Sequence, residues 1–255
     1  MADPLAHAAE QQPVDDYWSQ SRQPLMSLAF LAPLLVIYEA GALWLGSDGT
    51  VAIRNGADYW MRAGLDGLGF GPFLLLPGLI VGGLLGWHVF GKFPSRVSTE
   101  TLAGMFAESL LFAFVLIVLG QLQDLLFQKL SIGRTTLAIG EASSLARAVT
   151  FVGAGIYEEV LFRMCLLPLC YGLFRVSRLS VAWSAVLAVL ASSLIFSLAH
   201  YVGSGADTFS LFSFLFRALA GAFFAVLFCL RGLGITVGCH AAYDLLVGVL
   251  FAQGG

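Results

Sequence analysis

The sequence YEEVLFR at residues 157–163 places three charged side chains inside a long apolar run. The run extends from about residue 146 to residue 167, which is long enough for a helix to cross the hydrocarbon core of a membrane. On a helix, Glu159 and Arg163 lie about 40° apart around the axis, in the favourable acid-before-base order. Glu158 lies about 140° from Arg163. We therefore predict that Glu159 pairs with Arg163 and that Glu158 faces another part of the protein.

Charged side chains at this depth have two interpretations. An unpaired charge inside a membrane costs several kcal/mol, so a charge found there generally has a function or a partner. In the structural interpretation, Glu158, Glu159 and Arg163 only hold neighbouring helices together. In the functional interpretation, Glu158 is kept apart from Arg163 because its carboxylate takes part in chemistry.

The composition of the chain indicates a membrane protein. Hydrophobic residues make up 58% of the 255 residues and charged residues only 11%, against roughly 25% charged in soluble domains. The mean hydropathy is +0.86. We therefore predict an all-α protein, a polytopic membrane helical bundle with about seven transmembrane helices. A net charge of -3 without a basic block argues against a nucleic-acid partner.

Seven apolar stretches divide the chain. The predicted spans are about residues 25–45, 70–90, 102–122, 146–167, 181–201, 209–230 and 233–252. Residues 1–24 are predicted to be a polar tail, residues 25–145 to hold N-terminal transmembrane helices and loops, and residues 146–252 to form the C-terminal spans. Pro168 should end or kink the fourth span. The basic residues of the short loops place the N-terminus in the cytoplasm and the C-terminus outside.

Each of two histidines is four residues away from a side chain that it could contact on the same face of a helix. His200 closes the sequence FSLAH, so Phe196 and His200 share a helix face, and Asp244 lies one turn after His240. A carboxylate beside a neutral imidazole can hold a water, take its proton and return that proton to a leaving amine. A second imidazole can stabilise the oxyanion. Glu158, His200 and His240 could instead ligate zinc, although no His-Glu-x-x-His motif supports this alternative.

The sequence resembles a known family at these residues. It is similar to the CAAX protease and bacteriocin-processing (CPBP, or abortive-infection) family of glutamic-type intramembrane proteases, which includes the type II CAAX prenyl endopeptidases. The resemblance covers about residues 146–252. Its three motifs, in this order, are Glu158-Glu159-x-x-x-Arg163, Phe196-x-x-x-His200 and His240-x-x-x-Asp244.

The resemblance implies that residues 146–252 form a CPBP-like catalytic helical core. It assigns water activation to Glu158 with help from His200, the oxyanion site to His240 with Asp244, and supporting roles to Glu159, Arg163 and Phe196. The departure is Asp244, where the CAAX endopeptidases carry Asn. An ionised Asp cannot donate a hydrogen bond to an oxyanion. We therefore expect Asp244 to orient His240.

These observations favour a membrane-embedded, CAAX-protease-like endopeptidase that hydrolyses a peptide bond near the membrane. We expect no cofactor, and zinc is the less favoured alternative. The expected partners are the lipid bilayer and a peptide or protein substrate, lipidated or membrane-associated, and the expected location is the plasma membrane of a prokaryote. Two other functions stay open: a non-catalytic scaffold or chaperone, and a proton-coupled transporter. The transporter's proton relay would comprise Glu39, Glu108, Glu158 and Arg217.

The two histidines also pose a geometric question. His200 lies about 30 Å along its predicted span, but His240 lies only about 10 Å along its own. Straight, parallel helices would place the two imidazoles at different depths. Either the fifth span begins outside the membrane, or the helices are strongly tilted.

Overall fold

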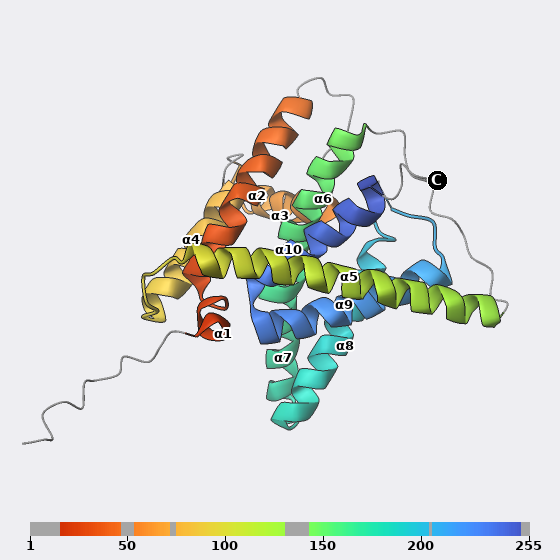
Figure 1. Cartoon of the computed structure of the whole chain (residues 1–255). Coiled ribbons are helices and arrows are strands. Elements are labelled where there is room, and N and C mark those ends of the chain that lie inside the picture. Colours follow the sequence, from red (N-terminus) through yellow and green to blue (C-terminus); the bar gives the residue numbers. More distant parts are fainter. Residues whose placement is uncertain (1–15, 47–53, 72–74, 131–142, 204–205, 251–255) are drawn as a thin grey trace, which may run out of the picture.

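The computed structural model describes residues 16–46, 54–71, 75–130, 143–203 and 206–250, and these ranges contain helices and no strand (Figure 1). The helices are α1 (Tyr17–Gln20), α2 (Pro24–Leu45), α3 (Gly56–Gly67), α4 (Leu75–Phe90), α5 (Thr99–Lys129), α6 (Ser144–Glu159), the π-helix η1 (Val160–Leu166), α7 (Leu167–Val176), α8 (Val181–Ala199), α9 (Leu211–Arg231), α10 (Leu233–Leu245) and the π-helix η2 (Leu246–Leu250). The predicted all-α class is confirmed.

Five helical segments of the described chain are long and apolar enough to cross a membrane: α2, α5, α8, α9, and α10 together with η2. Helix α4 is apolar but has only 16 residues. The predicted fourth span is divided among α6, η1 and α7. Large apolar side chains such as Trp44, Phe106 and Leu111 are exposed on the outer faces, as expected of surfaces that meet lipid. The membrane class is therefore supported, whereas the number seven stays a prediction.

Helix α10 is the central helix of the fold. Every residue from Leu233 to Ala241 is buried, and α10 contacts α2, α5, α6 and α9. Figure 1 shows α5 running across the view in front of α10, and the two helices are in contact. Close approach depends on glycine, because a Cβ on Gly238 would lie 2.4 Å from Ser109 Oγ. Gly232, with φ of +81°, allows α10 to begin directly after α9.

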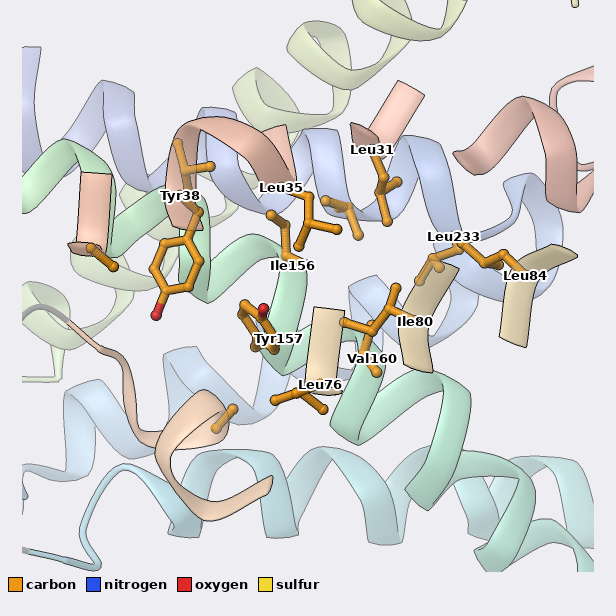
Figure 2. Packing of buried hydrophobic residues seen from close by; sticks show 14 of the residues in the cluster. Leu31, Leu35, Tyr38, Leu76, Ile80, Leu84, Ile156, Tyr157, Val160 and Leu233 are labelled. Carbon is orange, nitrogen blue, oxygen red and sulfur yellow. The ribbon is translucent and has the colours of Figure 1, made fainter. Parts of the chain in front are cut away.

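Helices α2, α4, α6 and α10 share one apolar core, which includes Leu35, Ile80, Ile156 and Leu233 (Figure 2). A second core joins α5, α9 and α10, and a smaller third one joins α7, α8 and α9. These cores surround α6 and α10, the two helices that carry Glu158 and His240.

Helices α6, η1 and α7 form one uninterrupted helical run from Ser144 to Val176. Pro168 does not end it, contrary to one of its two expected effects. A proline has no backbone N–H, and its ring would collide with the carbonyl group four residues earlier in an α-helix. The wider π-helical turns immediately before Pro168 relieve this conflict, as in the bond from Leu167 N–H to the Phe162 carbonyl oxygen five residues earlier. The π-helix begins directly after Glu159.

The described part of the predicted N-terminal tail is packed against the spans. Ser21 and Gln23 are buried. The Tyr17 hydroxyl donates a hydrogen bond to Glu108 Oε2 on α5, at 2.6 Å. Residues 16–23 therefore belong to the folded helical assembly.

Candidate active site

Glu158 and the two predicted histidines meet at one point. Glu158 is the second-last residue of α6, and its Oε2 lies 3.9 Å from His200 Nε2 and 3.8 Å from His240 Nε2. This oxygen is buried and has no hydrogen-bond partner within the described part of the chain. The prediction that Glu158 faces away from Arg163 and towards another part of the protein is confirmed.

His200 is held at the end of α8, where it forms the C-cap. Its Nδ1 lies 2.9 Å from the carbonyl oxygen of Phe196. A carbonyl oxygen only accepts hydrogen bonds, so Nδ1 carries the proton and Nε2 is a bare acceptor in the neutral ring. The Phe196 ring contacts the imidazole edge to face, with centroids 5.0 Å apart. The second motif thus presents an acceptor nitrogen to the space beside Glu158.

His240 is held from the other side by Glu159. Its Nδ1 lies 2.7 Å from Glu159 Oε1, and Glu159 Oε2 lies 3.0 Å from Arg163 Nε. The Phe224 ring stacks on the imidazole, with centroids 4.5 Å apart. The predicted pairing of Glu159 with Arg163 is confirmed, and the structure adds that the same carboxylate orients His240.

The supporting residues form the wall behind these imidazoles. Arg163 is almost fully buried, and its Nη2 donates to the Gly221 carbonyl oxygen of α9, at 3.3 Å. Its guanidinium carbon lies 4.5 Å from the centre of the Phe196 ring and 5.4 Å from that of Phe224. Arg163 of η1 therefore contacts Glu159 of α6, Phe196 of α8 and two residues of α9. The sequence analysis missed Phe224 and Gly221, which carry no charge or motif of their own.

Asp244 approaches the nitrogen of His240 that faces Glu158. Its Oδ2 lies 3.5 Å from His240 Nε2. The orientation of the ring is set at Nδ1 by Glu159, at a shorter distance. Asp244 therefore places a second carboxylate beside Nε2, the nitrogen of His240 that faces Glu158.

The other predicted charged residues of the spans lie in separate clusters. Glu108 accepts two hydrogen bonds from Arg231, and Arg217 pairs with Asp207. Glu39 pairs with arginines from the α3 region. The structure thus brings Glu158 together with His200, His240 and Asp244, and it keeps Glu39, Glu108 and Arg217 apart from them.

The two histidines reach Glu158 from different parts of their helices. Helix α8 delivers His200 from its C-terminal end, whereas α10 is buried from its first residue and delivers His240 after less than two turns. Both imidazoles therefore reach the same carboxylate.

Residues 140–246 match the family model described as "Type II CAAX prenyl endopeptidase Rce1-like". No curated protein and no solved structure matches the chain. The matched range contains all seven residues of the three motifs, from Glu158 to Asp244. The family belongs to the CAAX-type intramembrane proteases, in agreement with the apolar helices of the fold. Residues 140–246, which hold the three motifs, are therefore similar to the Rce1-like endopeptidases of the CAAX protease family.

Proposed function

We propose that the protein is an intramembrane endopeptidase in which Glu158 and His200 activate a water molecule. The observation that supports this proposal is the buried Oε2 of Glu158, which lies 3.8–3.9 Å from two imidazole nitrogens and lacks a hydrogen bond to any described residue. These separations are too long for direct hydrogen bonds. A water between the groups would satisfy both the carboxylate and the bare Nε2 of His200.

In the proposed reaction, Glu158 takes a proton from this water as the oxygen attacks the carbonyl carbon of the substrate. The carbonyl oxygen becomes an oxyanion, to which His240 Nε2–H donates a hydrogen bond. The carbon–nitrogen bond then breaks, and the leaving amine takes the proton from Glu158. Because Glu159 accepts the proton of His240 Nδ1, a proton on Nε2 requires the imidazolium form. Glu159 and Asp244 supply negative charge that favours this form.

The family implies a peptide or protein substrate at a membrane. We propose that the substrate is lipidated or membrane-associated, and that the enzyme lies in a prokaryotic plasma membrane. No metal ion is needed in the reaction as written. In the described residues, no group of three or more His, Cys, Asp and Glu side chains is arranged to hold a metal ion. We propose the glutamic-type mechanism, with zinc binding by Glu158, His200 and His240 as its alternative.

The test is hydrolysis of a quenched fluorogenic peptide with a prenylated C-terminal CAAX tail by the purified protein in detergent micelles. We expect Glu158→Gln to lower kcat by about 100-fold to 10,000-fold, the range typical of a lost general base. Glu100→Gln is the matched control, because Glu100 is an exposed acid in the first turn of α5. It should retain full activity.

Other outcomes of the same assay would contradict the proposal. Binding of the peptide without cleavage, unchanged in Glu158→Gln, would favour the scaffold or chaperone. Proton uptake into proteoliposomes without hydrolysis would favour the transporter. Activity that is lost to a chelator and restored by stoichiometric zinc would assign Glu158, His200 and His240 to metal binding.

A further inference from the structure

A buried polar network joins α2 and α3 to the helix that carries Glu158. Asp58 of α3 is fully buried and accepts three hydrogen bonds. The donors are the Tyr38 hydroxyl at 2.8 Å, Arg54 Nη1 at 2.6 Å and Arg62 Nε at 2.5 Å. The two arginines belong to the same segment as Asp58 and balance its charge, whereas the Tyr38 hydroxyl links this cluster to α2.

The network continues through Glu39 of α2 to Tyr157 of α6. Glu39 accepts from Arg62 Nη2 at 2.8 Å, from Arg54 Nη2 at 3.3 Å and from the Tyr157 hydroxyl. Two carboxylates are therefore balanced by two guanidinium groups. Burial acts to lower the pKa of Arg54, but the hydrogen bond and charge of Asp58, with the charge of Glu39, outweigh it and raise this pKa. The network is thus charged and internally paired.

Tyr157 directly precedes Glu158, and α2 packs closely against the side of α6 that carries Tyr157. A Cβ on Gly153, one turn earlier, would lie 2.0 Å from Cε2 of Tyr38. The rings of Tyr38 and Tyr157 lie next to each other, with centroids 5.3 Å apart (Figure 2). The Tyr38 ring packs against Gly153, and the Tyr157 hydroxyl donates to Glu39. Together these two contacts fix the rotation of α6 about its axis.

This rotation determines where the carboxylate of Glu158 lies. Tyr157 and Glu158 share one rigid helical turn, so a rotation that shifts one shifts the other by the same angle. With side chains ending about 5–6 Å from the axis, a rotation of about 10° moves the carboxylate by about 1 Å. A displacement of that size can cost about 100-fold in rate. The contacts of Tyr157 can therefore influence catalysis without touching the substrate.

We propose that Tyr157 is a positioning residue for Glu158, and that it acts through its hydroxyl bond to the Glu39–Asp58 network. The proposal rests on the proposed function, because it assigns a role relative to the reactive carboxylate. It also assigns a purpose to the N-terminal helices, which lie outside the matched range of residues 140–246. Of these helices, α2 and α3 contact α6, the helix that carries Glu158, and would hold it in place.

The test compares Tyr157→Phe with Tyr38→Phe. Both tyrosines are fully buried, and each donates its hydroxyl to a carboxylate of the same network, but only Tyr157 adjoins Glu158. With the prenylated fluorogenic peptide, we expect Tyr157→Phe to lower kcat about ten-fold with KM changed by less than about two-fold. Tyr38→Phe should lower the melting temperature to a similar degree and leave kcat within about two-fold of wild type.

Equal values of kcat in the two variants, whether both reduced or both normal, would overturn the positioning role. If Tyr157→Phe does not yield folded protein, Glu39→Asp serves in its place. This substitution keeps the negative charge but shortens the side chain by one methylene group, so the carboxylate moves away from the Tyr157 hydroxyl. We expect it to lower kcat with KM unchanged. Glu158→Gln is measured alongside. If Glu158→Gln stays active, both the proposed function and the positioning role are rejected. If Glu158→Gln is inactive but Tyr157→Phe and Tyr38→Phe have equal kcat, only the positioning role is rejected.

Discussion

Glu158 and Glu108 are both acids on helices of the apolar assembly, and their side chains are almost equally exposed, at 13% and 14%. Their partners differ. Glu108 accepts hydrogen bonds from Arg231 Nε at 2.6 Å, from Arg231 Nη2 at 2.7 Å and from the Tyr17 hydroxyl at 2.6 Å. Glu158 faces two imidazoles at 3.8–3.9 Å, and its buried oxygen has no hydrogen bond from any residue that the structure describes. The candidate catalytic carboxylate therefore differs from the structural one in lacking a hydrogen-bond partner among the described residues, not in its burial.

The surroundings of Glu108 fit a structural role. Arg231 ends α9, and its guanidinium carbon lies 3.7 Å from the centre of the Trp18 ring. Burial of Tyr17, together with its hydrogen bond to Glu108, raises its pKa to about 12, so its hydroxyl keeps its proton at neutral pH. The cluster ties α1 to α5 and α9, and all its members have partners.

The largest effect is expected within the double-glutamate motif itself. Arg163→Ala leaves the fully buried Glu159 without its cation, at a cost of roughly 3–5 kcal/mol in the free energy of unfolding. Glu159→Gln should also lower stability and, because it disturbs the bond to His240 Nδ1, should lower kcat of the folded fraction. Thermal unfolding followed in detergent, with kcat per folded molecule, measures both. Glu158→Gln should unfold close to the wild-type temperature. If it is as unstable as Arg163→Ala, Glu158 is a structural residue as well.

A smaller loss is expected at the Glu108 cluster. Arg231→Ala removes two charged hydrogen bonds, each worth about 1.5–3 kcal/mol, but the remaining Tyr17 hydroxyl and partial exposure limit the cost to roughly 2–3 kcal/mol. The folded protein should keep its kcat, because neither residue contacts the Glu158 site. Arg217→Ala is the comparison variant: its side chain is 16% exposed and its partner Asp207 is 41% exposed, so we expect a smaller loss of stability than in Arg231→Ala. A loss of kcat at unchanged stability in Arg231→Ala would break the distinction between the two regions.

The sequence allowed the local parts of this arrangement to be predicted. The pairing of Glu159 with Arg163 follows from a separation of four residues on one helix. The contact of Glu159 with His240 spans 81 residues and depends on how closely α6 approaches α10. That approach requires Gly155, where a Cβ would lie 2.8 Å from Cβ of Ala241. Packing of this kind leaves no periodic signal, so it could not be inferred from spacing.

The π-helix and the α3 network were missed for a similar reason. Pro168 indicated a disturbance of the helix, but not that wider turns would absorb it. Glu39 was recognised as an acid within a span, but its arginine partners come from a different segment of the chain. Neither partner could be identified without the fold, because a charge pattern along the chain does not specify which helices pack together.

Asp244→Asn is expected to have the smallest effect. Asp244 is intermediate between Glu158, whose buried oxygen lacks a hydrogen bond from any described residue, and Glu108, which accepts hydrogen bonds from Arg231 and Tyr17. Asp244 Oδ2 lies 3.5 Å from His240 Nε2, and its side chain is 21% exposed. Asn keeps an oxygen that accepts a hydrogen bond from Nε2–H, but it removes the negative charge that favours imidazolium. We expect Asp244→Asn to retain turnover within about ten-fold of wild type. Asp244→Leu, which removes both the acceptor and the charge, should lose most of it.

The pH dependence of kcat distinguishes this role of Asp244 from its alternative. If Asp244 accepts a hydrogen bond from the His240 imidazolium, loss of its charge lets the ring release its proton at lower pH. The alkaline limb of the rate profile of Asp244→Asn should then move to lower pH. If Asp244 is instead a protonated donor to the oxyanion, an Asn amide supplies the same donor at any pH. The alkaline limb of the variant would then broaden, and this result would reject a role for the Asp244 carboxylate in stabilising the His240 imidazolium.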